Sequence, residues 1–202
     1  MGGAPRLVLV TDRRSTGGRE LLDVIRAALD AGLPAVQLRE HDLPGGALFA
    51  LAEQLRVATS RTGALLLVND RVDVAIAVDA DGVQLGGGAM PVAAVRPLLG
   101  PGRLIGVSTH TPEEIAAAVG ADFVLFGPVW ATPSKSGPPR GEAHLVAAVR
   151  AAPVPVLAIG GVTAREVGAA RAAGAAGVAV IRAILAADDP AAATRALLAA
   201  LA

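Results

Sequence analysis

Short runs of β-branched and aliphatic residues alternate along this chain with Ala- and Leu-rich stretches of helical spacing. Eight such runs occur, at residues 7–11, 35–40, 65–70, 82–86, 104–109, 123–129, 154–161 and 177–181. Most are apolar throughout, which is typical of parallel strands with both faces buried. The alternation therefore predicts strands that each lead into a helix packed on the sheet.

The stretches between the runs carry the signals of amphipathic helices. In residues 20–29, the apolar side chains fall on one helical face and the charged ones on the opposite face. Thr111 and Thr163 each precede a carboxylate-bearing first turn, as expected of helix N-caps. Gly32 and Gly174 stand just before the next strand and predict helix ends.

Eight strand–helix units in 202 residues are the pattern of a small (β/α)8, or TIM, barrel. A doubly wound parallel sheet is the alternative, but it usually has fewer strands, and no GxGxxG motif follows the first run. No linker or shift of composition divides the chain. The sequence predicts an α/β protein with a single TIM-barrel domain over residues 1–202.

Composition narrows the classes of function. The 18 Lys and Arg balance the 18 Asp and Glu, and a net charge of +0 argues against a general nucleic-acid binder. The absence of cysteine excludes disulfides and thiolate metal sites. No apolar run reaches the roughly 18 residues of a membrane span, and no secretory signal is recognisable. We expect a cytoplasmic protein with a small-molecule ligand, no nucleic-acid partner and no membrane partner. A homo-oligomer is compatible with the sequence.

Polar residues gather where the predicted strands end, which in a barrel is where binding and catalytic residues lie. In chain order they are Gln37, Arg39, Glu40, His41, Asn69, Asp70, Gln84, Ser108, Thr109, His110, Thr132, Ser134, Lys135 and Arg182, with glycines at 86–88 and 160–161. The clustering predicts a ligand site at the carboxyl ends of the strands.

Some of these residues also have a purely structural interpretation. Arg39 can pair with Glu40 inside the barrel, although burying an arginine without a functional task is costly. Asp70 can cap the helix predicted to start at Arg71. His110 can cap or pack, because histidine has many structural uses.

Two further segments suggest an anionic ligand. Gly160, Gly161 and the helix start after the eighth strand occupy the usual phosphate site of a barrel, where backbone N–H groups and the helix dipole hold a dianion. These glycines can also serve tight turns alone. Residues 131–141 (ATPSKSGPPRG) have the composition of a flap over an anionic ligand, with a plain surface loop as the alternative.

Seven segments, taken in order, resemble one family. They are LVLVTD (7–12), VQLRE (36–40), VNDRVDVAIAVDADGVQLG (68–86), IGVSTHTPEE (105–114), FGPVWATPSK (126–135), VLAIGGV (156–162) and GAAGVAVI (174–181). Together they resemble the thiamine-phosphate synthase and thiazole tautomerase (TenI) family over nearly the whole chain. The resemblance implies a (β/α)8 barrel and a thiazole phosphate as the ligand.

In the synthase branch, a pyrimidine pyrophosphate ionises and the thiazole nitrogen attacks the resulting methylene. That reaction needs Mg²⁺ held by carboxylates, and cations around the departing pyrophosphate. The resemblance assigns Asp70 as a metal ligand if the chain is synthase-like. It assigns substrate binding to Gln37, Arg39, Asn69, Ser108, Thr132, Ser134 and Lys135.

Three positions depart from the synthase pattern. His41 stands where the family has Lys, and residues 86–89 read GGGA where the family has GQED. Asp70 is therefore the only matching carboxylate, and it can still help to bind Mg²⁺ together with pyrophosphate. Arg182 stands where the family has Ser beside the thiazole phosphate, so it either binds that phosphate or fills its site.

The tautomerase branch moves a proton within a carboxylated thiazole phosphate and needs no Mg²⁺. A positioned acid/base suffices, typically worth about 10²–10⁴-fold in rate. The resemblance assigns this proton shuttle to His110, with the phosphate held by Gly160, Gly161 and residues near Arg182.

The missing carboxylate favours the tautomerase branch. The sequence alone therefore predicts an isomerase, a thiazole tautomerase without a cofactor. The alternative is a thiamine-phosphate synthase with Mg²⁺, and the third hypothesis is a catalytically impaired thiazole-phosphate binder or regulator.

Overall fold

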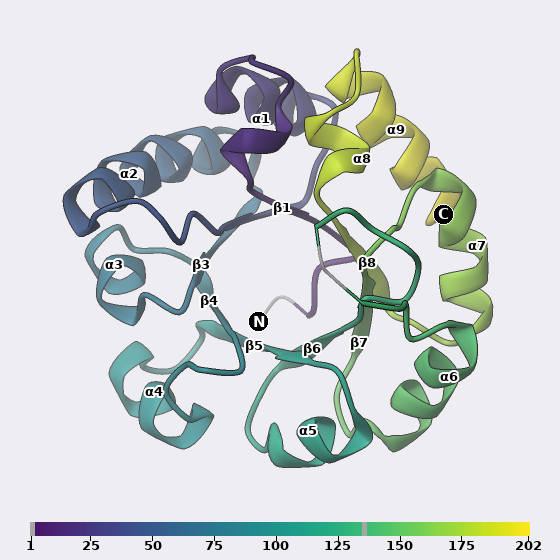
Figure 1. Ribbon diagram of the computed structural model, residues 1–202. Coiled ribbons are helices and arrows are strands. Elements are labelled where there is room, and N and C mark those ends of the chain that lie inside the picture. The colour runs from purple at the N-terminus through teal and green to yellow at the C-terminus, as the bar shows by residue number, and fades with distance from the viewer. Residues whose placement is uncertain (1–2, 135–136) are drawn as a thin grey trace.

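A computed structural model describes residues 3–134 and 137–202, and within these ranges eight parallel strands close into a barrel (Figure 1). The strands are β1 (Leu7–Val10), β2 (Ala35–Leu38), β3 (Leu65–Asn69), β4 (Gly82–Leu85), β5 (Leu104–Thr109), β6 (Phe123–Phe126), β7 (Val156–Ile159) and β8 (Gly177–Val180). They follow one another in chain order, and β1 pairs with β8 to close the barrel. The predicted (β/α)8 barrel is confirmed, and the doubly wound alternative is wrong.

Helices surround the strands as an outer ring (Figure 1). They are α1 (Leu21–Asp30), α2 (Gly45–Thr62), α3 (Val72–Ala77), α4 (Val92–Leu99), α5 (Pro112–Ala117), α6 (Glu142–Ala151), α7 (Ala164–Ala172), α8 (Arg182–Leu185) and α9 (Pro190–Ala200), with a 3-10 turn, η1 (Arg13–Ser15), between β1 and α1. The predicted caps are present: Thr111 accepts the Glu114 N–H at the start of α5, and Thr163 forms a capping box with Glu166 on α7.

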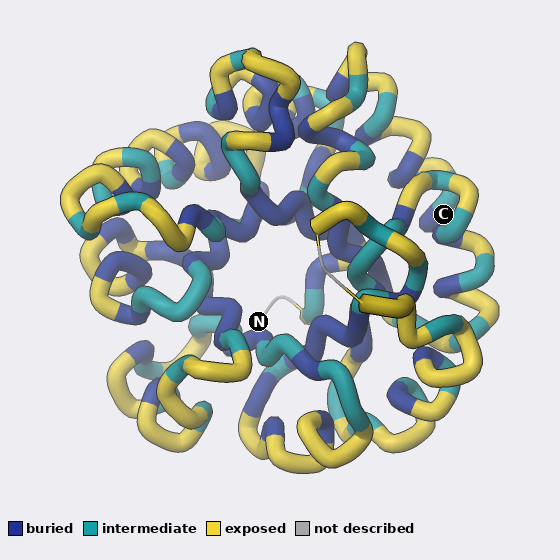
Figure 2. The backbone as a smooth tube through the Cα atoms, in the orientation of Figure 1, coloured by how far each residue is buried: buried dark blue, intermediate teal, exposed yellow. Residues whose placement is uncertain are grey.

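Strand β1 illustrates how the core is divided into two layers. Leu7 and Leu9 pack outward in the layer between strands and helices, whereas Val8 and Val10 pack inside the barrel. All four are at most 1% exposed, which explains why the strand runs are apolar at every position. Figure 2 shows that the strands are buried and that the helices around them are exposed on their outer faces.

The period-two alternation along each strand also carries polar side chains to one end of the barrel interior. On β5, the inward positions after Leu104 are Gly106 and Ser108, followed by His110 just beyond the strand. Gly106 has no room for a side chain, because a Cβ there would lie 2.1 Å from Gln84 Oε1 and 2.4 Å from Phe123 Cζ. The interior is therefore densely filled below the level of Ser108.

The amino end of the barrel is covered by the start of the chain. The first described residues lie within the ring of strands in the view of Figure 1, and Ala4 packs against the interior apolar cluster. The carboxyl end, where the polar side chains emerge, is thus the end that can admit a ligand.

Among the helices that the structure describes, none is both long enough and apolar enough to cross a membrane.

Candidate active site

A cavity of about 310 Å³ lies at the carboxyl end of the barrel. Every strand contributes to its wall, either from its last residues or from the loop that follows. The lining residues are Val10, Gln37, Arg39, His41, Asn69, Asp70, Gly86, Gly87, Gly88, Ser108, His110, Leu125, Gly127, Pro128, Ser134, Ile159 and Ile181.

The structure brings many of the predicted site residues together in this wall. Those that line the cavity are Gln37, Arg39, Asn69, Asp70, Ser108, His110 and Ser134. Thr132, Gly160, Gly161 and Arg182 are among the described residues but lie outside the lining. Lys135 falls outside the described residues.

A chain of hydrogen bonds orients Asp70. Gln37 Nε2 donates to Asn69 Oδ1 at 2.8 Å, and Asn69 Nδ2 donates to Asp70 Oδ2 at 2.8 Å. The backbone N–H of Gly86 donates to Asp70 Oδ1 at 2.7 Å. Both carboxylate oxygens are thus held by protein N–H groups, and each retains lone-pair capacity for a ligand.

The alternative interpretation of Asp70 as a helix cap is wrong. Helix α3 begins at Val72, its N-cap residue is Arg71, and the cap makes no side-chain hydrogen bond. Asp70 instead adopts φ 58°, a left-handed conformation that Asp tolerates better than most residues. Its carboxylate turns towards Asn69 and Gly86 at the cavity wall.

Gln84, which lies deeper in the barrel interior, orients Ser108. The fully buried Gln84 donates from Nε2 to Ser108 Oγ at 3.0 Å. Because Ser108 Oγ accepts this hydrogen bond, its own hydrogen can be donated to a ligand in the cavity. Gln84 Oε1 is buried with no hydrogen-bond partner among the described residues, which costs about 1–3 kcal/mol for an amide oxygen.

Two hydrogen bonds help to fix His110. Its ring Nδ1 is hydrogen-bonded to the carbonyl oxygen of Gly127, and its backbone N–H donates to the Glu114 carboxylate. Since a carbonyl oxygen only accepts, Nδ1 carries a hydrogen, and proton exchange with a ligand would use Nε2. Thr111, rather than His110, caps α5.

The predicted alternative of an Arg39–Glu40 ion pair is also wrong. Glu40 is buried and pairs with Arg13, whose Nη1 lies 3.0 Å from Glu40 Oε2. Within the described residues, no carboxylate lies within 4.0 Å of the Arg39 guanidinium. Arg39 lines the cavity, where it is available to an anionic ligand.

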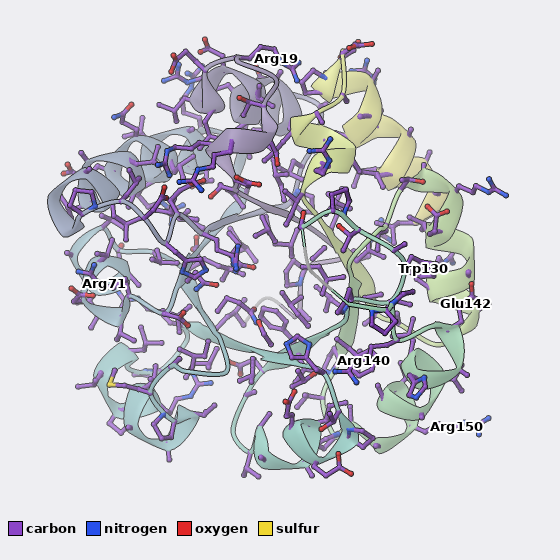
Figure 3. All side chains as sticks on the ribbon, in the orientation of Figure 1. Arg19, Arg71, Trp130, Arg140, Glu142 and Arg150 are labelled. Atoms are coloured by element: carbon purple, nitrogen blue, oxygen red, sulfur yellow. The ribbon has the colours of Figure 1, made fainter. Side chains whose placement is uncertain are left out.

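Gly160 and Gly161 are explained by backbone packing. Their φ angles are 94° and 69°, and a Cβ on either would lie 2.5 Å from an atom of the loop after β6. Trp130 in that loop packs over Gly161 and donates from Nε1 to Glu142 at 3.2 Å (Figure 3). The phosphate role of the two glycines stays a prediction.

The cavity has two chemically different walls. The polar wall comes from β2 to β5 and their loops and includes Gln37, Arg39, His41, Asn69, Asp70, Ser108 and His110. The apolar wall comes from β6, β7, β8 and β1 and includes Leu125, Pro128, Ile159, Ile181 and Val10. Among the lining residues that the structure describes, Asp70 is the only carboxylate, and the described chain has no cluster of three His, Asp or Glu that could hold a metal.

The sequence did not single out the apolar wall. Val10, Leu125, Ile159 and Ile181 read as ordinary core residues, because they continue apolar strand runs. The signal that could have found them is position: each is the last inward-facing residue of its strand or directly follows it. His41 belongs to the polar residues expected at the strand ends, although the family resemblance assigned it no role, and it lines the cavity.

This fold and this cavity define a TIM-barrel enzyme with a small-molecule site at the carboxyl ends of its strands. The chain belongs to the thiamine monophosphate synthase/TenI family, since the family model described as thiamine monophosphate synthase matches residues 7–184.

Known proteins resemble the chain over nearly its full length. A putative thiamine-phosphate synthase of Geobacter sulfurreducens is 54% identical over 199 residues, which cover 96% of this chain and 93% of that protein. A thiamine-phosphate synthase of Roseiflexus castenholzii is 49% identical over 193 residues, with coverage of 94% and 85%. The structure of a thiamine phosphate pyrophosphorylase from Pyrococcus furiosus has a TM-score of 0.87 and 36% identity, with coverage of 97% and 95%.

Proposed function

We propose that this protein is a thiamine-phosphate synthase, a transferase that joins a hydroxymethylpyrimidine pyrophosphate to a thiazole phosphate and releases pyrophosphate. The observation that carries the proposal is the identity of 54% and 49% to proteins with that name over most of both chains. The sequence alone favours the tautomerase. The names of these relatives favour the synthase instead.

The polar wall suits the departure of pyrophosphate. In the proposed reaction the bond between the pyrimidine methylene and a pyrophosphate oxygen breaks, and a bond from that methylene to the thiazole nitrogen forms. Negative charge therefore grows on the leaving group, where preoriented donors lower the barrier most. Arg39, His41 and the Ser108 hydroxyl supply such donors from one side of the cavity, and Lys135 is a further predicted one.

Asp70 fits the role of one Mg²⁺ ligand. Its oxygens are fixed by Asn69 and Gly86, and Mg²⁺ is commonly held by one or two carboxylates together with substrate phosphates. With a single carboxylate in the described lining, the protein would share the ion with the bound pyrophosphate. When bound, Mg²⁺ would neutralise charge on the departing pyrophosphate.

The apolar wall suits the aromatic rings. Val10, Leu125, Ile159 and Ile181 offer aliphatic contacts and keep water from the side on which the reactive methylene is exposed. Gln37 and Asn69 would bind substrate through the amide atoms that face the cavity. Thr132, Ser134, Gly160, Gly161 and Arg182 stay proposed contacts of the thiazole phosphate side.

A thiazole tautomerase is the second candidate, because two observations favour it. The segment at residues 86–88 consists of glycines where a second carboxylate would be expected of a synthase. His110 is held through Nδ1 by Gly127, which suits a proton shuttle acting through Nε2. This reaction needs no Mg²⁺. A thiazole-phosphate binder without catalysis is the third candidate.

Parallel assays separate these candidates. Purified protein is incubated with both synthase substrates, and separately with the carboxythiazole phosphate tautomer, each with and without Mg²⁺. We expect Mg²⁺-dependent formation of thiamine phosphate.

The proposal is overturned if no thiamine phosphate forms while the tautomer is aromatised without Mg²⁺ and His110→Ala abolishes that reaction. The matched control is His144→Ala, which alters an exposed histidine on α6. Tight thiazole-phosphate binding with neither reaction would identify a binder.

A further inference from the structure

The end of β2 and the loop that leads to α2 present their residues alternately to two sides. Gln37, Arg39 and His41 line the cavity. The intervening acidic residues Glu40 and Asp42 face away from it, towards Arg13 in the turn after β1. The cavity-facing cations and the acidic residues therefore belong to one short segment whose position is set by its contacts with Arg13.

Arg13 makes a dense set of contacts with this segment. Its backbone N–H donates to Glu40 Oε1 at 3.0 Å, and its Nη1 donates to Glu40 Oε2 at 3.0 Å. The guanidinium also holds Asp42 in a bidentate manner, with Nη1–Oδ1 at 2.5 Å and Nη2–Oδ2 at 2.7 Å. One side chain thus contacts both acidic residues that flank His41, and Arg14 also pairs with Asp42.

Thr11, two residues before Arg13, makes a second set of contacts with the same segment. The buried Thr11 donates from its backbone N–H to the Gln37 carbonyl at 2.9 Å and accepts the Arg39 N–H on Oγ1 at 2.8 Å. The segment after β1 therefore contacts four of the six positions from 37 to 42, which span the end of β2 and the loop that follows it. Pairing between β1 and β2 fixes Gln37, and Arg13 fixes Glu40 and Asp42.

The chemistry of this contact favours a single geometry. The Glu40 side chain is only 3% exposed, so removing its partner would leave a buried carboxylate uncompensated. The planar guanidinium matches a carboxylate with two parallel hydrogen bonds, which lysine cannot reproduce. Hydrogen bonding to Arg13 lowers the pKa of Asp42 to about 2, so the contact remains charged through the physiological pH range.

We propose that Arg13 is a positioning residue, which through Glu40 and Asp42 holds the loop after β2 so that Arg39 and His41 face the anionic group of the ligand. The inference rests on the proposed function, in which that anionic group is pyrophosphate. Arg13 itself stays outside the cavity lining of the described chain. Small displacements of charged groups matter because a misplacement of about 1 Å can cost up to about 10²-fold in rate.

The test uses Arg13→Gln in the full chain, with inorganic pyrophosphate in the presence of Mg²⁺ as the probe. We expect the Kd of pyrophosphate, measured by calorimetry, to rise about tenfold in this variant, and kcat for thiamine phosphate formation to fall about tenfold as well, because Arg39 and His41 face charge that grows in the transition state. Arg13→Lys should fall between the two. Asp42→Asn, which leaves Glu40 paired, should shift Kd less and in the same direction.

The matched control is Arg96→Gln. Arg96 pairs with Asp122 at 2.6 Å with side-chain exposures of 34% and 38%, close to the 35% and 40% of Arg13 and Asp42. It lies near the amino end of β6, away from the cavity, so its loss should lower Tm and leave the Kd of pyrophosphate unchanged.

Two results would overturn the inference: wild-type pyrophosphate affinity in Arg13→Gln and Arg13→Lys, or an equal loss of affinity in Arg96→Gln. If thiamine phosphate forms but Arg13→Gln behaves as wild type, the inference fails and the proposed function stands. If no thiamine phosphate forms but Arg13→Gln still weakens pyrophosphate binding, the proposed function fails and the positioning role stands. A wild-type protein that does not bind pyrophosphate overturns both.

Discussion

The two walls of the cavity share the same strand geometry and differ in chemistry. At the carboxyl ends of β2 to β5, the side chains facing the cavity carry amides, a guanidinium, a carboxylate, a hydroxyl and two imidazoles. At the same level on β6, β7, β8 and β1 they are those of Leu125, Ile159, Ile181 and Val10. In the proposed reaction the pyrophosphate would therefore lie towards β2 to β5, and the rings would lie against the aliphatic side chains of the other wall.

The walls are also held in place by different forces. The polar wall is linked by hydrogen bonds from Gln37 through Asn69 to Asp70, and from Gln84 to Ser108. The apolar wall is held by packing, which is non-directional and tolerates exchanges of similar volume. A substitution in the polar wall should therefore alter the chemical step, whereas one in the apolar wall should alter substrate affinity.

Substitution of Asp70 in the polar wall should have the largest effect on activity. In Asp70→Asn the new amide group must place its NH₂ against either the Asn69 amide or the Gly86 N–H, both of which are donors. We expect kcat/KM for thiamine phosphate formation to fall about 10²–10³-fold, as for other losses of charge stabilisation. The control, Asp73→Asn, removes an exposed carboxylate on α3 and should retain activity. A loss below about tenfold would contradict the role of Asp70.

A substitution in the apolar wall should have a smaller effect, on substrate affinity rather than on the chemical step. Ile181→Ser removes aliphatic surface worth about 0.8 kcal/mol per methylene from the cavity. Steady-state kinetics should show KM for a substrate raised about tenfold, with kcat changed little. Ile76→Ser, on the exposed face of α3, serves as the comparison and should change neither constant. A fall in kcat alone would mean that the apolar wall takes part in the chemical step.

A substitution at Gln84 can distinguish a role in orienting Ser108 from a role in stability. Gln84→Met removes the hydrogen bond to Ser108 and also the unpartnered Oε1. We expect kcat to fall about fivefold, in keeping with a net hydrogen bond of about 1 kcal/mol, while Tm stays equal or rises. Thermal unfolding and kinetics on the same preparation test this. A variant that loses stability and keeps its kcat would show that Gln84 only packs.

The smallest effect concerns pH and the Arg13–Asp42 contact. The pKa of Asp42 is lowered from 3.8 to about 2 in the folded protein, mainly by its hydrogen bond from Arg13. A lowered pKa means that the contribution to stability is fully present above the unfolded value and is lost as pH falls through about 2. The difference in unfolding free energy between wild type and Asp42→Asn should be constant above about pH 5 and should shrink steadily as pH falls from there through about 2. A difference that does not change with pH would contradict the charged contact.

Strand positions could be predicted because the apolar runs are continuous, but their ends could not. The seventh run was predicted over residues 154–161, whereas β7 covers Val156–Ile159. Gly160 and Gly161 have positive φ angles and cannot continue a strand. Likewise β2 ends at Leu38, because Arg39 and Glu40 turn into the loop that Arg13 holds.

The site was predictable in part for a related reason. Asn69, Ser108 and His110 lie at or just beyond the ends of strands whose alternation points them inward, so a place at the strand end was sufficient. Asp70 reaches the same cavity through the left-handed turn that follows β3. Arg182 also follows a strand, yet it starts α8 as an exposed residue outside the cavity lining. A position in sequence indicates the end of the barrel at which a residue lies, but not the direction of its side chain in a loop.

The sequence by itself determined the barrel, the end that carries the polar residues and the family, because periodicity and motifs are local properties of the chain. Only the tertiary structure decided that Glu40 pairs with Arg13 and not with Arg39, that Gln84 supports Ser108, and that one side of the cavity wall is aliphatic. Those outcomes depend on contacts between residues more than 20 positions apart. Closing the barrel brings these residues together, and no local pattern records which partner each side chain meets.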